Sequence, residues 1–214
     1  MENVEARKKR VKSIIKTLKK TYPHERLALD FTTPLELLIA LILAAQCTDE
    51  RVNRVTPMLF RKYRTAKDWM NADRAELEDE IHSTGFFRQK SSSIQKCTTE
   101  LVERFDGEVP RKLDDLLALS GVGRKTANIL RGNAFGDPAI GVDTHVGRLS
   151  FRLGLTKQTD PDKIEADLTA VIPRADQVQF CFLLQRHGRE ICLARKPKCD
   201  ACVVSALCPK QGVV

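Results

Sequence analysis

The chain has 214 residues, 42% of them hydrophobic, which is enough to bury a core without help from disulfides. Its formal net charge of +8 favours a polyanionic partner such as nucleic acid, although a solvated basic surface without a specific partner is the alternative. The longest apolar run, Leu37 to Ala45, is far shorter than the ~20 residues of a membrane-spanning helix. The N-terminus shows no secretory signal, so we expect an intracellular protein.

Hydrophobic residues recur at helical spacing along the chain and predict an all-α protein. Residues 2–20 form an amphipathic pattern that ends at Tyr22-Pro23. Thr33-Pro34 starts a nearly all-apolar helix that should lie in the core, and Asp49 is expected to cap the next one. Further helices are predicted over 66–72, 73–82, 88–106, 113–119, 124–134, 143–153, 161–171 and 174–188.

Four of the seven cysteines lie in the last 23 residues and suggest a metal centre in a reducing compartment. They follow the spacing Cys192-x6-Cys199-x2-Cys202-x5-Cys208. Zinc sites usually bring two close pairs, whereas here there is one, so the spacing favours an iron–sulfur cluster while a zinc knuckle stays open.

A glycine-rich turn joins two predicted helices over Leu119 to Ala127. Gly121 and Gly123 allow a tight hairpin, and the free N–H groups of the helix that follows add to an anion site. This is the pattern of a helix–hairpin–helix that grips a DNA phosphate, with Arg124 beside it. Lys125 falls in the first turn, where the helix dipole disfavours an ammonium and so favours an amine nucleophile; phosphate binding is its plainer role.

The segment Val142 to His145 opens another predicted helix. Asp143 fits an N-cap, and near a nucleophilic lysine it could instead stabilise a cationic sugar or orient water. His145 is better suited to contacting phosphate than to catalysis.

Together these features resemble the endonuclease III family of helix–hairpin–helix glycosylases over essentially the whole chain. The matching strings are Leu35–Ala40, Ala45–Asp49, Gly107–Pro110, Leu119–Ala127, Val142–His145, Ala194–Cys199 and the four-cysteine pattern.

The resemblance implies two helical domains flanking a DNA-binding cleft: a six-helix barrel over 27–138, and a [4Fe-4S] cluster domain formed by 1–26 and 139–214. It implies a base excision repair glycosylase with AP lyase activity, acting on duplex DNA that contains oxidised or ring-saturated pyrimidines or abasic sites. The strand would be cut 3′ to the abasic site by β-elimination. We expect a monomer that is cytoplasmic, nucleoid-associated and prokaryotic.

The resemblance also implies roles for single residues. Lys125 matches the Schiff-base nucleophile and Asp143 the catalytic aspartate. Gln46 matches the residue that fills the space left by the flipped base, and Phe86 or its neighbour Phe87 the apolar wedge. The cations between the first two cysteines are expected to contact phosphate; they are Arg195, Lys196 and Lys198.

The chain departs from the family pattern at Ser120, where proline is common, and at Cys47, where small residues are usual. An adenine-mismatch glycosylase would carry glutamate near position 42, where this chain has Ile42, and a thymine-mismatch glycosylase would lack Lys125. A non-enzymatic DNA clamp and an iron–sulfur electron carrier are the alternatives from other functional classes.

Overall fold

The computed structural model describes residues 2–213 and contains helices but no strand within that range. The all-α prediction is therefore confirmed. None of these helices is long and apolar enough to cross a membrane. The chain divides into two compact units, one formed by residues 28–136 and the other by the residues up to Leu27 together with those from Asp137 onward.

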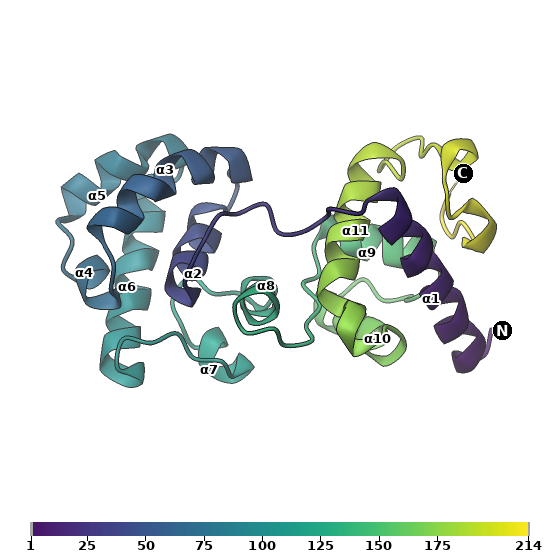
Figure 1. Ribbon diagram of the computed structural model, residues 1–214, viewed down its shortest axis with the longest axis horizontal. Coiled ribbons are helices and arrows are strands. Elements are labelled where there is room, and N and C mark those ends of the chain that lie inside the picture. The colour runs from purple at the N-terminus through teal and green to yellow at the C-terminus, as the bar shows by residue number, and fades with distance from the viewer. Residues whose placement is uncertain (1, 214) are drawn as a thin grey trace. The chain divides into compact units, whose positions relative to one another are not determined.

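The unit of residues 28–136 is built around a helix that is buried on nearly all sides. This helix, α2 (Pro34–Leu43), begins with the predicted Thr33 cap and Pro34, and six of its ten residues are buried. It packs against its neighbours α3, α6 and α8, as Figure 1 shows. The helices of the unit are α2, α3 (Asp49–Lys62), α4 (Ala66–Met70), α5 (Arg74–Ile81), η1 (His82–Thr84), α6 (Phe87–Phe105), α7 (Leu113–Leu117) and α8 (Arg124–Ala134).

The other unit joins the two ends of the chain in one core. In Figure 1 the purple α1 (Val4–Thr21) lies beside the yellow-green α11, and both pack against neighbouring helices of the same unit. The predicted amphipathic face of α1 supplies Val11, Ile14, Ile15 and Leu18 to this core. The remaining elements are α9 (Thr144–Arg152), α10 (Pro161–Val171), η2 (Arg174–Asp176), α11 (Gln177–Glu190), η3 (Cys199–Ala201) and η4 (Ser205–Leu207).

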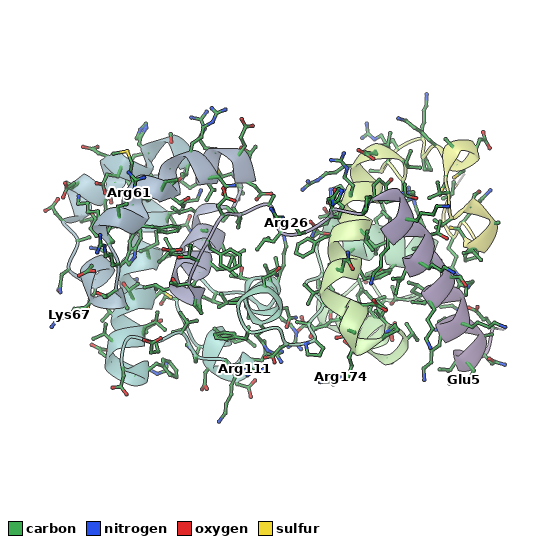
Figure 2. All side chains as sticks on the ribbon, in the orientation of Figure 1. Glu5, Arg26, Arg61, Lys67, Arg111 and Arg174 are labelled. Carbon is green, nitrogen blue, oxygen red and sulfur yellow. The ribbon has the colours of Figure 1, made fainter. Side chains whose placement is uncertain are left out.

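Most charged side chains lie outside these cores, and within residues 2–213 Lys90 and Arg152 are buried exceptions. Arg61 and Lys67 extend from the surface of the first unit and Glu5 from α1, as Figure 2 shows, and all three are exposed.

The cap expected at Asp49 is one residue too late. The backbone of Thr48 is extended and its hydroxyl accepts from the Arg51 N–H at 3.3 Å, whereas Asp49 is the first residue of α3. A cap needs non-helical backbone angles, and Thr48 has them. The expected helix over 174–188 also differs, since it starts as the 3-10 turn η2 and continues as α11 to Glu190.

Two helix-interior glycines of the second unit differ in the space around them, which predicts opposite effects of alanine. A Cβ on Gly188 would lie 2.6 Å from His145 Nδ1 and 3.0 Å from Arg148 Nη2, whereas one on Gly147 would meet only Ile164 Cδ1 at 3.6 Å. We expect Gly188→Ala to lower the free energy of unfolding by about 1–3 kcal/mol through steric strain. We expect Gly147→Ala to raise it by about 0.5–1 kcal/mol through helix propensity. Urea unfolding measures both, and equal effects would contradict the packing described here.

Candidate nucleic-acid interface and metal centre

The four C-terminal cysteines line one pocket. Cys192, Cys199, Cys202 and Cys208 are each partly buried, and all four face the pocket together with Arg152 and Lys198. Within residues 2–213 no set of three or more His, Cys, Asp or Glu side chains is arranged to hold a single metal ion. Four thiols around one pocket form the ligand set that an iron–sulfur cluster requires.

Hydrogen-bond donors point at these sulfurs. Arg152 Nη1 donates to Cys192 Sγ at 3.3 Å, and the Lys210 N–H donates to Cys208 Sγ at 3.3 Å. Donors of this kind stabilise thiolate ligands and orient them. The donor set thus fits an anionic iron–sulfur centre.

A third sulfur, that of Cys202, is reached through His187. Burial lowers the pKa of His187, so its ring is neutral, and burial raises the pKa of Tyr22 to about 12, so its hydroxyl keeps its proton. The Tyr22 hydroxyl lies 3.0 Å from Nδ1, and Nε2 lies 3.3 Å from Cys202 Sγ. When Tyr22 donates to Nδ1, the single ring N–H is on Nε2 and donates to the sulfur.

Two other cysteines are separate from this pocket. Burial raises the pKa of Cys97 and of Cys181 to about 12, so both stay as thiols near neutral pH. They behave as small apolar core residues.

The loop between the first two cysteines presents its cations to solvent. Arg195, Lys196 and Lys198 are exposed, and none has an ion pair within residues 2–213. Lys196 adopts a left-handed conformation with φ 50°, and the Lys198 N–H donates to Ile191 O at 2.9 Å. Three unpaired cations on a fastened loop can contact phosphate.

The two glycines of the hairpin meet different demands. Gly121 has φ +79°, and a Cβ there would lie 3.1 Å from the Ser93 Cβ, so the fold itself requires glycine. Gly123 precedes α8 with ordinary backbone angles and open space around its missing Cβ. Within residues 2–213 no side chain forms a capping hydrogen bond to this helix. The first N–H groups of α8 have no partner within the helix itself, which suits this helix start to binding an anion.

A carboxylate fastens the hairpin at the position where proline is common. The Ser120 N–H donates to Glu100 Oε2 and its hydroxyl to Glu100 Oε1, both at 2.6 Å. Proline has no N–H and no hydroxyl for these bonds. Sequence reasoning missed Glu100, because only its place on α6 brings it to the hairpin.

The proposed catalytic pair lies in two different units. Lys125 is exposed in the first turn of α8 and has no ion pair within residues 2–213, while Arg124 before it is partly buried. Asp143 is the predicted N-cap of α9: its Oδ1 accepts from the Val146 N–H at 2.8 Å. Its second carboxylate oxygen keeps its capacity to accept another bond.

His145 packs inside its unit. It is partly buried, and its Nδ1 lies 3.1 Å from Arg148 Nη2. Gly188 of α11 leaves the space that the ring occupies.

Gln46 and Phe86 lie on two loops of the first unit and share an unusual backbone. Gln46 has φ 54° and Phe86 φ 48°, a left-handed conformation that costs a non-glycine residue roughly 1–2 kcal/mol. Gln46 is exposed, and 61% of the Phe86 surface is exposed. Phe87 is instead partly buried, with its ring 4.5 Å from that of His82. Strained backbone of this kind marks functional loops.

Two family profiles match the chain. The HhH-GPD superfamily base excision DNA repair protein profile covers residues 39–174, and the iron-sulfur binding domain of endonuclease III covers residues 192–208. The second match begins and ends at the outer two of the four cysteines.

Whole-chain comparisons agree with these profiles. The chain is 51% identical to endonuclease III of Synechocystis sp. over 98% of its own length and 96% of that protein. It is 42% identical to the Bacillus subtilis endonuclease III, covering 90% of this chain and 91% of that one. It is also similar to the protein in a non-covalent endonuclease III–DNA complex, with TM-score 0.86, 42% identity and 95% of each chain covered.

The bonds between Glu100 and Ser120 predict a role for Glu100 in holding the hairpin. We expect Glu100→Ala to weaken binding to undamaged duplex DNA about three- to tenfold, because the loosened turn must be ordered when it binds phosphate. Faster hydrogen exchange at the Ser120 amide should accompany this change. Glu103→Ala, an exposed residue of the same helix, is the matched control. Unchanged affinity and exchange in Glu100→Ala would contradict this role.

Proposed function

The chain belongs to the endonuclease III family of base excision DNA repair proteins, and we propose that Lys125 is the Schiff-base nucleophile of this enzyme. It is a DNA glycosylase with AP lyase activity that binds duplex DNA and carries an iron–sulfur cluster. It acts on oxidised or ring-saturated pyrimidines and on abasic sites. The single observation that carries the residue assignment is the exposed, unpaired Lys125 in the uncapped first turn of α8, beside the hairpin.

Lys125 takes part in both base removal and strand cleavage, because it stays covalently bound to C1′ through both. Its neutral amine attacks C1′ of the damaged nucleotide, the glycosidic bond breaks, and the base leaves with the bonding electrons and takes up a proton. Loss of the amine proton and opening of the sugar ring give a Schiff base between Nζ and C1′. Removal of a proton from C2′ then expels the 3′ phosphate, which is β-elimination, and water releases the lysine.

Asp143 provides the negative charge that this chemistry needs. One carboxylate oxygen holds the start of α9, which fixes the side chain, and the other is left for the site. In the enzyme–DNA complex it stabilises the positive charge that develops on the sugar and assists proton transfer.

DNA is held by backbone amides and cations rather than by contacts that read sequence. The hairpin with Gly121, Gly123 and Arg124 binds one phosphate at the start of α8. The unpaired cations Arg195, Lys196 and Lys198 bind the backbone at a second place, and His145 contacts phosphate beside the catalytic aspartate.

Gln46 and Phe86 act on the duplex when the damaged nucleotide is flipped out. The amide of Gln46 hydrogen-bonds to the orphaned base, and Phe86 enters the base step as an apolar wedge. The exposure of Phe86 and the tilted ring contact of Phe87 with His82 favour Phe86 as the wedge.

We assign Cys192, Cys199, Cys202 and Cys208 as the ligands of a [4Fe-4S] cluster. When bound, the cluster supplies iron–thiolate bonds that fasten the loop from residue 192 to 208 and thereby its cations. We also propose that the protein works as a monomer in the cytoplasm, associated with the nucleoid of a prokaryote, in keeping with its bacterial relatives.

Lys125→Ala tests the nucleophile. We expect borohydride trapping and strand cleavage on duplexes with thymine glycol or an abasic site to fall by more than about a thousandfold, with DNA binding retained. Lys163→Ala is the matched control, because Lys163 is also an exposed lysine in the first turn of a helix, α10. Trapping that survives in Lys125→Ala would rule out Lys125 as the nucleophile.

Cys202→Ala tests the ligand set. We expect loss of most of the iron and sulfide, about four of each per chain in the wild type, together with the visible absorption. Cys181→Ala removes a buried thiol of the same unit and should keep the full cluster. Full iron content in Cys202→Ala would contradict the assignment.

A further inference from the structure

A buried lysine connects the loop that bears Gln46 to the loop that bears Phe86. Lys90 lies in the first turn of α6 and is only 4% exposed. Its Nζ donates to Leu43 O at 2.7 Å and to Thr84 O at 2.8 Å. Its backbone N–H donates to Phe86 O at 3.0 Å. One residue is thus bonded to both loops at their origins.

The two carbonyl groups come from places where helices end. Leu43 is the last residue of α2 and Thr84 the last residue of η1, so both carbonyls lack a helical partner. The C-terminal end of α2 carries partial negative charge and attracts a cation, and the Thr84 carbonyl adds a second acceptor. Lysine is almost never buried without a partner, and Lys90 has no carboxylate partner within residues 2–213. The two helix ends therefore take the place of a counterion.

Lys90 and the two carbonyls that it bonds, those of Leu43 and Thr84, are called the clamp from here on. Gln46 and Phe86 each follow one of these carbonyls by only a few residues. Gln46 follows Leu43 by three residues, with the Cys47 N–H bonded to Ala44 O at 3.1 Å, and Phe86 follows Thr84 by two. Each path ends in a left-handed, non-glycine residue whose side chain is exposed. A shift of either carbonyl would carry directly into the position of the side chain that enters the DNA.

We propose that Lys90 is a positioning residue for lesion recognition, which sets the spacing between Gln46 and Phe86 so that both side chains enter the duplex together. This inference rests on the proposed roles of these two residues. A preformed pair does not have to be ordered at the moment of binding, which improves the discrimination of damaged from undamaged DNA.

Lys90→Met tests the proposal in the full-length, cluster-loaded enzyme, because methionine keeps an unbranched apolar side chain but cannot donate to either carbonyl. The measured quantity is the ratio of affinities for a duplex with a reduced abasic-site analogue and for the same undamaged duplex. We expect Lys90→Met to lower this ratio about tenfold and the doubly substituted Gln46→Ala, Phe86→Ala enzyme to lower it at least as much. Adding Lys90→Met to that enzyme should have no further effect, since coupled residues are not additive.

Ile94→Ala is the matched control, because it removes a fully buried side chain from the same helix that has no hydrogen bond to the loops. It should lower the Tm and leave the affinity ratio unchanged. If Lys90→Met does not fold, Lys90→Arg and Lys90→Gln replace it. Arginine keeps a cation with several donors, whereas glutamine is shorter and neutral, so the ratio should be higher for arginine.

Three results would overturn the proposal, and they separate it from the proposed function. A wild-type ratio in Lys90→Met, or equal ratios in the arginine and glutamine variants, would refute the clamp alone. If Lys90→Met lowered the affinity ratio equally in the wild type and in the Gln46→Ala, Phe86→Ala enzyme, Lys90 would have only a structural role. A wild-type ratio in the Gln46→Ala, Phe86→Ala enzyme would refute the proposed roles of those side chains, and the clamp with them.

Discussion

Backbone carbonyls at helix ends and in irregular segments need hydrogen-bond donors, and in this protein buried or half-buried cations supply them. Arg10 donates to Leu153 O and Leu207 O, and Arg152 donates to Leu193 O and Ala194 O. Lys90 does the same for Leu43 and Thr84. Arg10 and Lys90 each bond two carbonyls that are far apart in sequence, whereas Arg152 bonds two adjacent carbonyls that are far from Arg152 itself. These bonds hold the ends of short helices and their irregular connections in fixed positions.

The same constraint explains why the N-terminal helix belongs with the C-terminal cysteines. Besides its apolar face, α1 contributes Arg10, which bonds the last residue of η4, and the cap Tyr22, which bonds His187. His187 in turn reaches Cys202. The segment that surrounds the cluster pocket is therefore fastened by polar bonds to α1 as well as by packing. Iron–thiolate bonds add to a loop that side chains already orient.

Much of the fold and of the site could be predicted from sequence because the signals are local. Helical periodicity located α1, the Thr33-Pro34 start signal located α2, and cysteine spacing located the metal-binding segment. The bond from Lys90 to Leu43 spans 47 residues, and the bonds from Ser120 to Glu100 span 20. No local pattern encodes such partners, since they depend on how the helices pack. Phe86 and Phe87 could not be told apart for the same reason, since only the folded structure shows which ring packs against His82.

The hairpin shows how a physical reading separates structural from functional residues within one motif. Gly121 is required by the fold itself, because its positive φ and its distance to Ser93 disfavour a side chain. Gly123 has neither constraint, so its lack of a side chain matters only when something outside the protein approaches the amides of α8. A phosphate bound at a helix N-terminus must approach the backbone closely, and glycine leaves room for that approach. The open glycine, rather than the strained one, is thus the part of the hairpin that points to DNA.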